Sequence, residues 1–173
     1  MTDKEYLDQA LMLEDSYSRL PRLLEHAFDL PADDWLHLLG EWWENCDNIG
    51  QYLEEIRESV TYHWSLTPIW QMMNAKENAA FDALPDAMTI YRGCYDINKW
   101  GASWSLNREV AERFPHLTRY SNEGRPLLIK ATIPKSRVAA LKLGRGEEEI
   151  VTFLRPKCIS ISTAKQHEFF AIA

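Results

Sequence analysis

The chain has 173 residues, a formal net charge of −7, and a hydrophobic content of 46% that includes seven Trp, seven Tyr and six Phe. This length and composition predict one ordinary domain, or a helical segment packed on a small domain, with a substantial core. The acidic balance argues against general attraction to nucleic acid, which depends largely on phosphate neutralisation.

The first 84 residues predict helices. Apolar residues recur at helical spacing within residues 20–28, 35–43 and 49–60, and Thr67-Pro68 predicts the start of a fourth helix that runs towards Leu84. Pro21 suits the first turn of the first helix, and the next two helices have predicted caps in Asp33 or Asp34 and in Asp47. We therefore assign residues 1–85 to a helical N-terminal segment.

The pattern changes at 84–86, where short β-rich runs begin. Seven strands are predicted, at residues 88–95, 101–106, 126–133, 138–143, 147–154, 158–162 and 167–173. One helix interrupts them, over residues 107–114, with Asn107 as its cap. This order predicts an α+β fold in which the helical segment packs on a mixed, mainly antiparallel sheet within residues 86–173. The glycine-rich loops of dinucleotide-binding α/β folds are absent from the sequence.

The sequence also bears on location and on metal or thiol chemistry. No apolar run approaches the roughly 20 residues that span a bilayer, and the acidic N-terminus has no basic-then-apolar leader, so we expect a cytoplasmic protein with no membrane partner. Three widely spaced cysteines, Cys46, Cys94 and Cys158, fit reduced core thiols. The histidines have no ligand-like spacing, so no metal site is predicted.

Three short motifs in the second half carry side chains suited to chemistry. They are Tyr91-Arg92-Gly93 at the end of the first predicted strand, Ser103-Trp104-Ser105 on the second, and Glu147-Glu148-Glu149 at the start of a later one. Each motif alone has an ordinary structural explanation, as a surface ion pair, a strand hydroxyl pair or a solvated turn. Glu149 is the hardest to explain in this way. It begins an apolar strand, where an inward-facing carboxylate is costly without a partner.

Taken in this order, the motifs resemble those of the arginine–serine–glutamate class of mono-ADP-ribosyltransferases. That family has an arginine on its first core strand, usually followed by glycine, and a Ser-x-Ser strand that leads into a helix with an Ala-x-x-Phe pattern, here Ala111 to Phe114. Its third motif ends in a glutamate before two aliphatic residues, here Glu149 before Ile150-Val151. The resemblance covers about residues 86–173 and identifies them as an ADP-ribosyltransferase-like catalytic core.

The resemblance implies NAD⁺ as co-substrate. Glu149 would stabilise the positive charge that develops on the ribose as nicotinamide leaves. Arg92 would anchor the pyrophosphate through its planar, permanently charged guanidinium. Ser103 would hydrogen-bond both the ligand and Glu149, and Glu147 would contact the acceptor, where a glutamate is associated with arginine acceptors. The other predicted NAD⁺-binding residues are Tyr91, Gly93, Trp104, Ser105 and Phe114.

The resemblance leaves two possible roles for Trp104 and implies supporting roles for several neighbouring positions. Trp104 replaces the usual threonine of the serine motif, so its ring would either pack in the core or line the nicotinamide pocket. Gly93 would let the backbone approach the nicotinamide amide, and Ser105 would support the sheet. The loop 143–146 would help to choose the acceptor, its glycines allowing it to move, and Glu148 would face solvent.

The expected reaction is therefore transfer of ADP-ribose to a macromolecular acceptor, with protein arginine favoured by the Glu-x-Glu motif. RNA or DNA is the alternative acceptor, and a local basic patch that includes Arg108, Arg113, His116, Arg119 and Arg125 would bind it, although a solvated helix and loop is the favoured explanation of these residues. Two different functions also fit the sequence, namely a catalytically inactive binding module on the same fold and an NAD⁺ hydrolase. The resemblance also suggests a toxin, a phage protein or a phage-defence effector, with an antitoxin or other neutralising partner.

Overall fold

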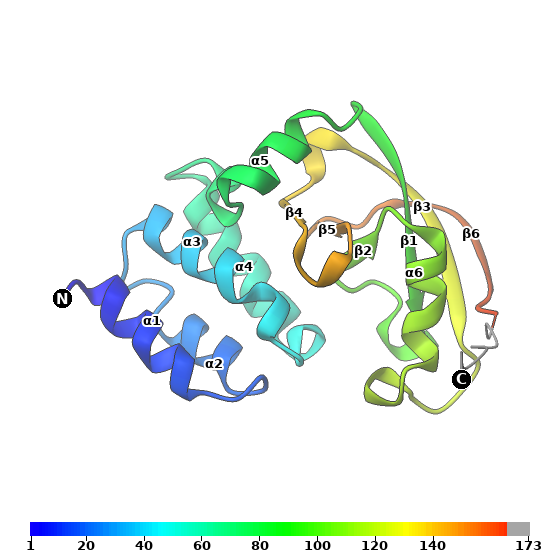
Figure 1. The fold of residues 1–173 in the computed structure, drawn as a ribbon, viewed down its shortest axis with the longest axis horizontal. Coiled ribbons are helices and arrows are strands. Elements are labelled where there is room, and N and C mark those ends of the chain that lie inside the picture. The colour runs from blue at the N-terminus through cyan, green and yellow to red at the C-terminus, as the bar shows by residue number, and fades with distance from the viewer. Residues whose placement is uncertain (166–173) are drawn as a thin grey trace, which may run out of the picture.

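The structure is a computed structural model and describes residues 1–165 (Figure 1). Five helices precede the sheet: α1 (Asp3–Leu13), α2 (Arg19–Glu25), α3 (Ala32–Trp42), α4 (Leu53–Trp64) and α5 (Ala75–Asp82). A sixth, α6 (Arg108–Arg113), follows the second strand. The five N-terminal helices lie together on one side of the molecule and the sheet lies on the other (Figure 1). The predicted α+β class is confirmed.

Six strands form one sheet. They are β1 (Ala87–Cys94), β2 (Ser103–Ser105), β3 (Leu127–Pro134), β4 (Ala140–Lys142), β5 (Glu149–Val151) and β6 (Lys157–Thr163), in the order β4-β5-β2-β1-β3-β6. Within residues 1–165 every pair is antiparallel. Six of the seven predicted strands are present, although β2, β4 and β5 are shorter than predicted. The seventh, at residues 167–173, lies outside the described residues.

The N-terminal caps of several helices differ from the predicted ones. Helix α1 was not among the helices that we predicted, and it begins with a capping box between Thr2 and Glu5. The predicted aspartate caps of α3 and α4 are wrong. The N-cap of α3 is Pro31, which places Asp33 and Asp34 in its first turn, where acidic side chains favour the helix dipole. Asp47 instead accepts a hydrogen bond from the Ser16 hydroxyl at 2.6 Å.

The predicted fourth helix is divided into two pieces. A 3₁₀ turn, η3 (Ile69–Met72), comes first, and α5 starts separately after Asn74. The reason is a capping box, because the Asn74 side chain accepts from the Glu77 amide and the Glu77 carboxylate accepts from the Asn74 amide, both at 3.0 Å. By contrast, the Asn107 cap of α6 is confirmed, since its side chain accepts from two amides of the first turn.

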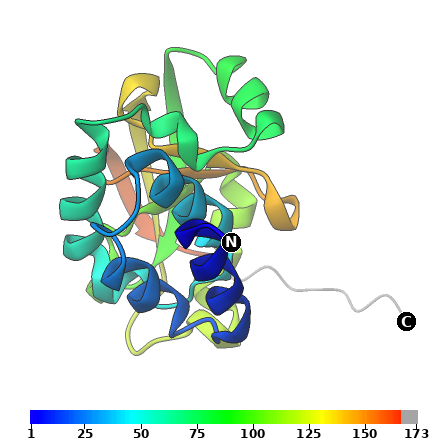
Figure 2. The same ribbon diagram turned by 90° about the vertical axis from the view of Figure 1, so that its left-hand side faces the viewer.

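The helical segment and the sheet share one hydrophobic core. Its buried members come from both parts, among them Trp35 and Leu39 of α3, Ile90 of β1, Ile129 of β3 and Ile150 of β5. Seen from the side of the helical segment, α1 to α4 lie in front of the sheet (Figure 2). The boundary near residue 85 therefore divides the chain by type of secondary structure, but the two parts are packed as a unit.

Polar contacts also join the two parts. Lys142 of β4 lies 2.8 Å from the Glu77 carboxylate of α5, and both side chains are buried. Arg57 of α4 donates from Nε to the carbonyl of Phe153 at 3.0 Å. Across residues 1–165, no helix combines the length and the apolar character needed to cross a bilayer.

Candidate active site

A pocket of about 240 Å³ lies where the helical segment meets the sheet. Its floor comes from β1, β2 and β5 and holds Arg92, Ser103 and Glu149. One wall is formed by the 3₁₀ turns η1 (Trp43–Asn45) and η2 (Ile49–Tyr52), and the other by the end of α6 and the turns after it. All the residues that the sequence singled out for NAD⁺ binding and catalysis border this one pocket.

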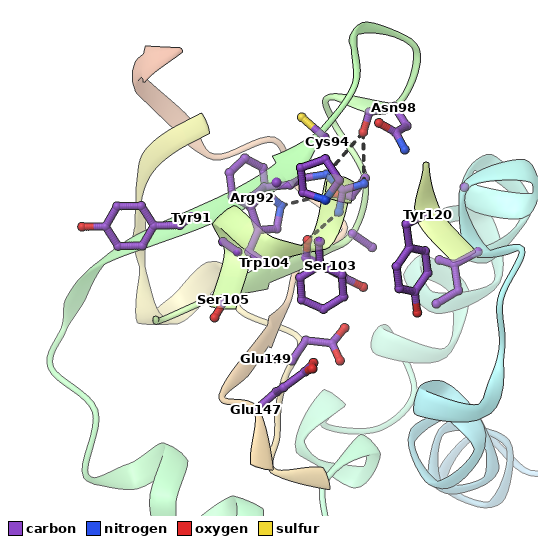
Figure 3. A pocket seen from close by; sticks show the side chains of 18 of the residues that line it. Tyr91, Arg92, Cys94, Asn98, Ser103, Trp104, Ser105, Tyr120, Glu147 and Glu149 are labelled. Atoms are coloured by element: carbon purple, nitrogen blue, oxygen red, sulfur yellow. Dashed lines mark hydrogen bonds between the residues drawn. The ribbon is translucent and has the colours of Figure 1, made fainter. Parts of the chain in front are cut away.

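Arg92 bridges β1 and β2 at the point where they stop pairing. The two strands are in register only at Tyr91 and Ser105. Beyond that pair, Arg92 Nη1 donates to the carbonyl of Ser103 at 2.6 Å, while Nε and Nη2 donate to the carbonyl of Asn98 at 3.2 and 3.0 Å (Figure 3). Burial lowers the pKa of Arg92, and the nearby groups of Cys94 and Glu149 oppose that shift. Arg92 thus keeps the floor of the pocket in shape, a role that the motif did not predict.

Gly101 is required by this arrangement, and we did not predict it from the sequence. A Cβ atom at position 101 would lie 2.3 Å from Nη2 and 2.6 Å from Cζ of Arg92. The guanidinium therefore lies flat against the backbone of Gly101, in space that any other residue would fill. In the sequence, Gly101 could have been recognised by its position two residues before the serine motif. It lies in the loop whose carbonyl groups accept from Arg92.

Glu149 is held by two neutral donors. The Ser103 hydroxyl donates to its carboxylate, as predicted, and Trp43 Nε1 donates to Oε1 at 2.9 Å. Burial raises the pKa of Glu149, the two hydrogen bonds and Lys142 lower it, and Glu44 raises it. Because both hydrogen-bond donors are uncharged, they fix the direction of the carboxylate without cancelling its charge.

Trp43 and Glu44 are functional candidates that we did not predict. Trp43 is buried, and its ring packs edge-on against Phe153 with centroids 5.8 Å apart. The neighbouring Glu44 accepts a hydrogen bond from the Gly144 amide at 2.9 Å, and a Cβ at position 144 would lie 1.7 Å from its Oε2. The loop 143–146, predicted to move, is therefore held by the helical segment at Gly144.

The two outer glutamates of the third motif differ in exposure. Glu147 is half-buried and lies in the turn after η8 (Gly144–Gly146), before β5 begins. It borders the same pocket as Glu149 (Figure 3). Glu148 is exposed, as predicted. Within the described residues, no group of three or more His, Cys, Asp or Glu side chains could hold a metal ion.

Two aromatic rings form part of the wall opposite Trp43. Phe114 and Tyr120 have centroids 5.4 Å apart with planes tilted by 47°, and both border the pocket. Phe114 was predicted from the family pattern, whereas Tyr120 was not. The Tyr120 ring projects into the pocket opposite Ser103 and Glu149 (Figure 3).

The remaining predicted ligand residues have mainly structural contacts. The Tyr91 ring points away from Arg92 and packs on a small cluster of Ala111, Leu128 and Ala164 (Figure 3). Trp104 is a core residue, with its ring 6.5 Å from that of Trp100 and its Nε1 donating to the Gly101 carbonyl at 3.0 Å. Trp104 is thus packed in the core, and it also borders the pocket.

Ser105 accepts a hydrogen bond at its hydroxyl from the Asn107 amide at 3.0 Å. It thus supports the turn from β2 into α6, and its role extends beyond the predicted support of the sheet.

Gly93 allows α6 to lie close to β1. A Cβ at this position would be 1.8 Å from the carbonyl oxygen of Ala111. Gly93→Ala is therefore expected to lower the free energy of unfolding by about 1–3 kcal/mol, the usual effect of overpacking, as measured by urea denaturation. Gly50→Ala is the matched control, since Gly50 also borders the pocket and a Cβ there meets nothing within 4 Å. Equal effects at the two positions would contradict this explanation.

The pocket cysteines are poor nucleophiles. Burial raises the pKa of Cys46 to about 12, and its thiol donates to the carbonyl of Trp42 at 3.3 Å. Burial also raises the pKa of Cys94. A thiolate is the reactive form of cysteine, so both residues are expected to be inert. All three cysteines are free, but Cys158 is exposed on β6, so its predicted core position is wrong.

Comparison of the chain with known proteins identified no related sequence or structure. No family model matches the chain, and neither curated protein sequences nor solved structures give a match. The fold and the pocket define an α+β protein with an arginine, a serine and a glutamate around one site.

Proposed function

We propose that this protein is a mono-ADP-ribosyltransferase that moves ADP-ribose from NAD⁺ to a macromolecular acceptor. The observation that carries the proposal is the partly buried Glu149 carboxylate, oriented by Ser103 and Trp43 and open to a pocket that Arg92 also borders. A fixed carboxylate of this kind stabilises positive charge on a sugar as its leaving group departs. The nicotinamide of NAD⁺ is such a leaving group, already positively charged before the bond breaks.

The pocket is smaller than a whole dinucleotide requires. Pockets that enclose drug-sized ligands usually have about 300–1,000 Å³, and this one has about 240 Å³. We infer that the nicotinamide ribose lies inside, against Glu149, and that the adenosine end extends out of the pocket. The part of the Arg92 guanidinium that is not used by Asn98 and Ser103 would then face the pyrophosphate.

The direct test is incubation with labelled NAD⁺ and a cell extract, followed by protease or nuclease treatment. Label that protease releases identifies a protein acceptor, which the Glu-x-Glu motif favours, and label that nuclease releases identifies RNA or DNA. Free ADP-ribose formed without any macromolecule would make the protein an NAD⁺ hydrolase. Absence of both NAD⁺ binding and nicotinamide release would refute the proposal and leave a non-catalytic binding module.

Glu147 gives a prediction about the acceptor. It borders the same pocket as Glu149, and a carboxylate there can pair with a guanidinium and accept its proton. Glu147→Ala is expected to reduce transfer to the acceptor more than hydrolysis of NAD⁺, measured in parallel with the same labelled substrate. Glu148→Ala, at the exposed neighbour, should leave both rates unchanged. Equal loss of transfer and hydrolysis in Glu147→Ala would instead make Glu147 a structural residue.

A further inference from the structure

The helical segment reaches the proposed catalytic carboxylate through one 3₁₀ turn. Trp43 and Glu44 are consecutive residues of η1, at the end of α3. Trp43 Nε1 donates to Glu149 Oε1 at 2.9 Å, and Glu44 accepts from the Gly144 amide at 2.9 Å. The turn therefore holds both ends of the short segment that carries the third motif, at positions about a hundred residues away along the chain.

The indole is itself fixed in place. Its exposed fraction is 1%, and it packs edge-on against Phe153, the residue whose carbonyl accepts from Arg57 of α4. A second link, the buried pair of Glu77 and Lys142, joins α5 to β4 next to β5. With these links on both sides, the position of Trp43 relative to Glu149 is set by the packing of the two parts.

We propose that Trp43 is a positioning residue for Glu149, so that the N-terminal helical segment is an integral part of the active site. Ser103 alone would leave the carboxylate free to rotate about the bond that carries it. A second donor, fixed by the core, holds it facing the sugar. The kinetic part of this inference rests on the proposed function, whereas the hydrogen bond and its effect on the titration of Glu149 do not.

The charges around Glu149 define the expected pH effect. The charged groups that act on it are Arg92 of β1, Lys142 of β4 and Glu44 of η1, and Glu147 of the preceding turn borders the same pocket. The indole N–H stabilises the charged form of the carboxylate, so it lowers the pKa of Glu149 against the effect of burial. Loss of that donor is therefore expected to raise the pKa and to move the acid limb of the rate profile to higher pH.

The experiment compares Trp43→Phe with Trp35→Phe. Trp35 is an equally buried tryptophan of the same segment, and its Nε1 donates to the carbonyl of Leu23 at 2.8 Å, away from the pocket. In Trp43→Phe we expect kcat for nicotinamide release to fall about 10- to 100-fold, the worth of a hydrogen bond to a charged group. The KM for NAD⁺ should change little, and the acid limb should shift upward. Trp35→Phe should leave kcat and the pH profile as in the wild type, even if it lowers the melting temperature.

Two further measurements distinguish failure of this inference from failure of folding or of the proposed function. If Trp43→Phe does not fold, benzothienylalanine at position 43 keeps the size of the ring and removes only the N–H donor. If the wild type releases no nicotinamide, the proposed function fails, and carboxyl ¹³C NMR of Glu149 still tests the contact. The pKa of Glu149 should be higher in the Trp43 variant, which lacks the N–H donor, than in the wild type and in Trp35→Phe. Wild-type values of both kcat and the pKa of Glu149 in a folded Trp43 variant would overturn the inference.

Discussion

Glu149→Gln is expected to abolish NAD⁺ turnover, by about 10²–10³-fold or more, while the protein remains folded. The amide has nearly the shape of the carboxylate, and its oxygen can still accept from Trp43 Nε1. What it lacks is the negative charge that offsets the positive charge on the ribose as nicotinamide leaves. The loss should therefore appear in kcat, measured by nicotinamide release at saturating NAD⁺, with NAD⁺ binding by calorimetry largely retained.

The neighbouring glutamate provides the matched control. Glu148→Gln makes the same chemical change one residue earlier, at an exposed side chain, and should have wild-type turnover. Circular dichroism and the melting temperature should be close to wild type in both variants. Turnover near the wild-type rate in Glu149→Gln would refute the mechanism, whatever the identity of the acceptor.

Lys142→Met is expected to lower the free energy of unfolding by about 3–5 kcal/mol, because it leaves a buried charge without its partner. Lys142 Nζ lies 2.8 Å from the Glu77 carboxylate and 3.3 Å from the carbonyl of Met72. The same carboxylate accepts from the Asn74 amide at the start of α5 and from the Leu143 amide at 3.3 Å. Loss of the lysine therefore weakens the join between the helical segment and β4, which urea denaturation would measure.

A double variant and a partly exposed ion pair serve as controls that separate the effect of a buried charge from the effect of lost side-chain volume. Glu77→Gln with Lys142→Met removes both charges and keeps one oxygen, which can accept from either the Asn74 or the Leu143 amide, so it should regain part of the lost stability. Lys4→Met removes one partner of a partly exposed pair with Asp34, 3.4 Å apart, and should cost at most about 1 kcal/mol. If the double variant is no more stable than Lys142→Met, the charge of Glu77 is not the source of the effect.

Local sequence signals predicted the strands better than the helix boundaries. A strand is marked by alternating or continuous apolar residues, and this pattern located β1, β3 and β6 closely. Capping depends on a few atoms at each helix end. Asp47, which has the right residue type for a cap, instead accepts from Ser16, which lies 31 residues earlier. The residue type alone could not distinguish these two uses.

Residue types and their spacing were enough to single out Arg92, Ser103 and Glu149 as candidate site residues, since they stand at recognisable places in three short motifs. That these three border one pocket follows from the order of the sheet, in which β5, β2 and β1 are neighbours. The contact from Trp43 to Glu149, across 106 positions, could be found only once the helical segment was seen packed on the sheet. The sequence pattern around a buried tryptophan is the same whether its N–H donates to a backbone carbonyl, as in Trp35, or to a carboxylate, as in Trp43. The acceptor depends on which element packs against the ring, and that is decided by the tertiary structure.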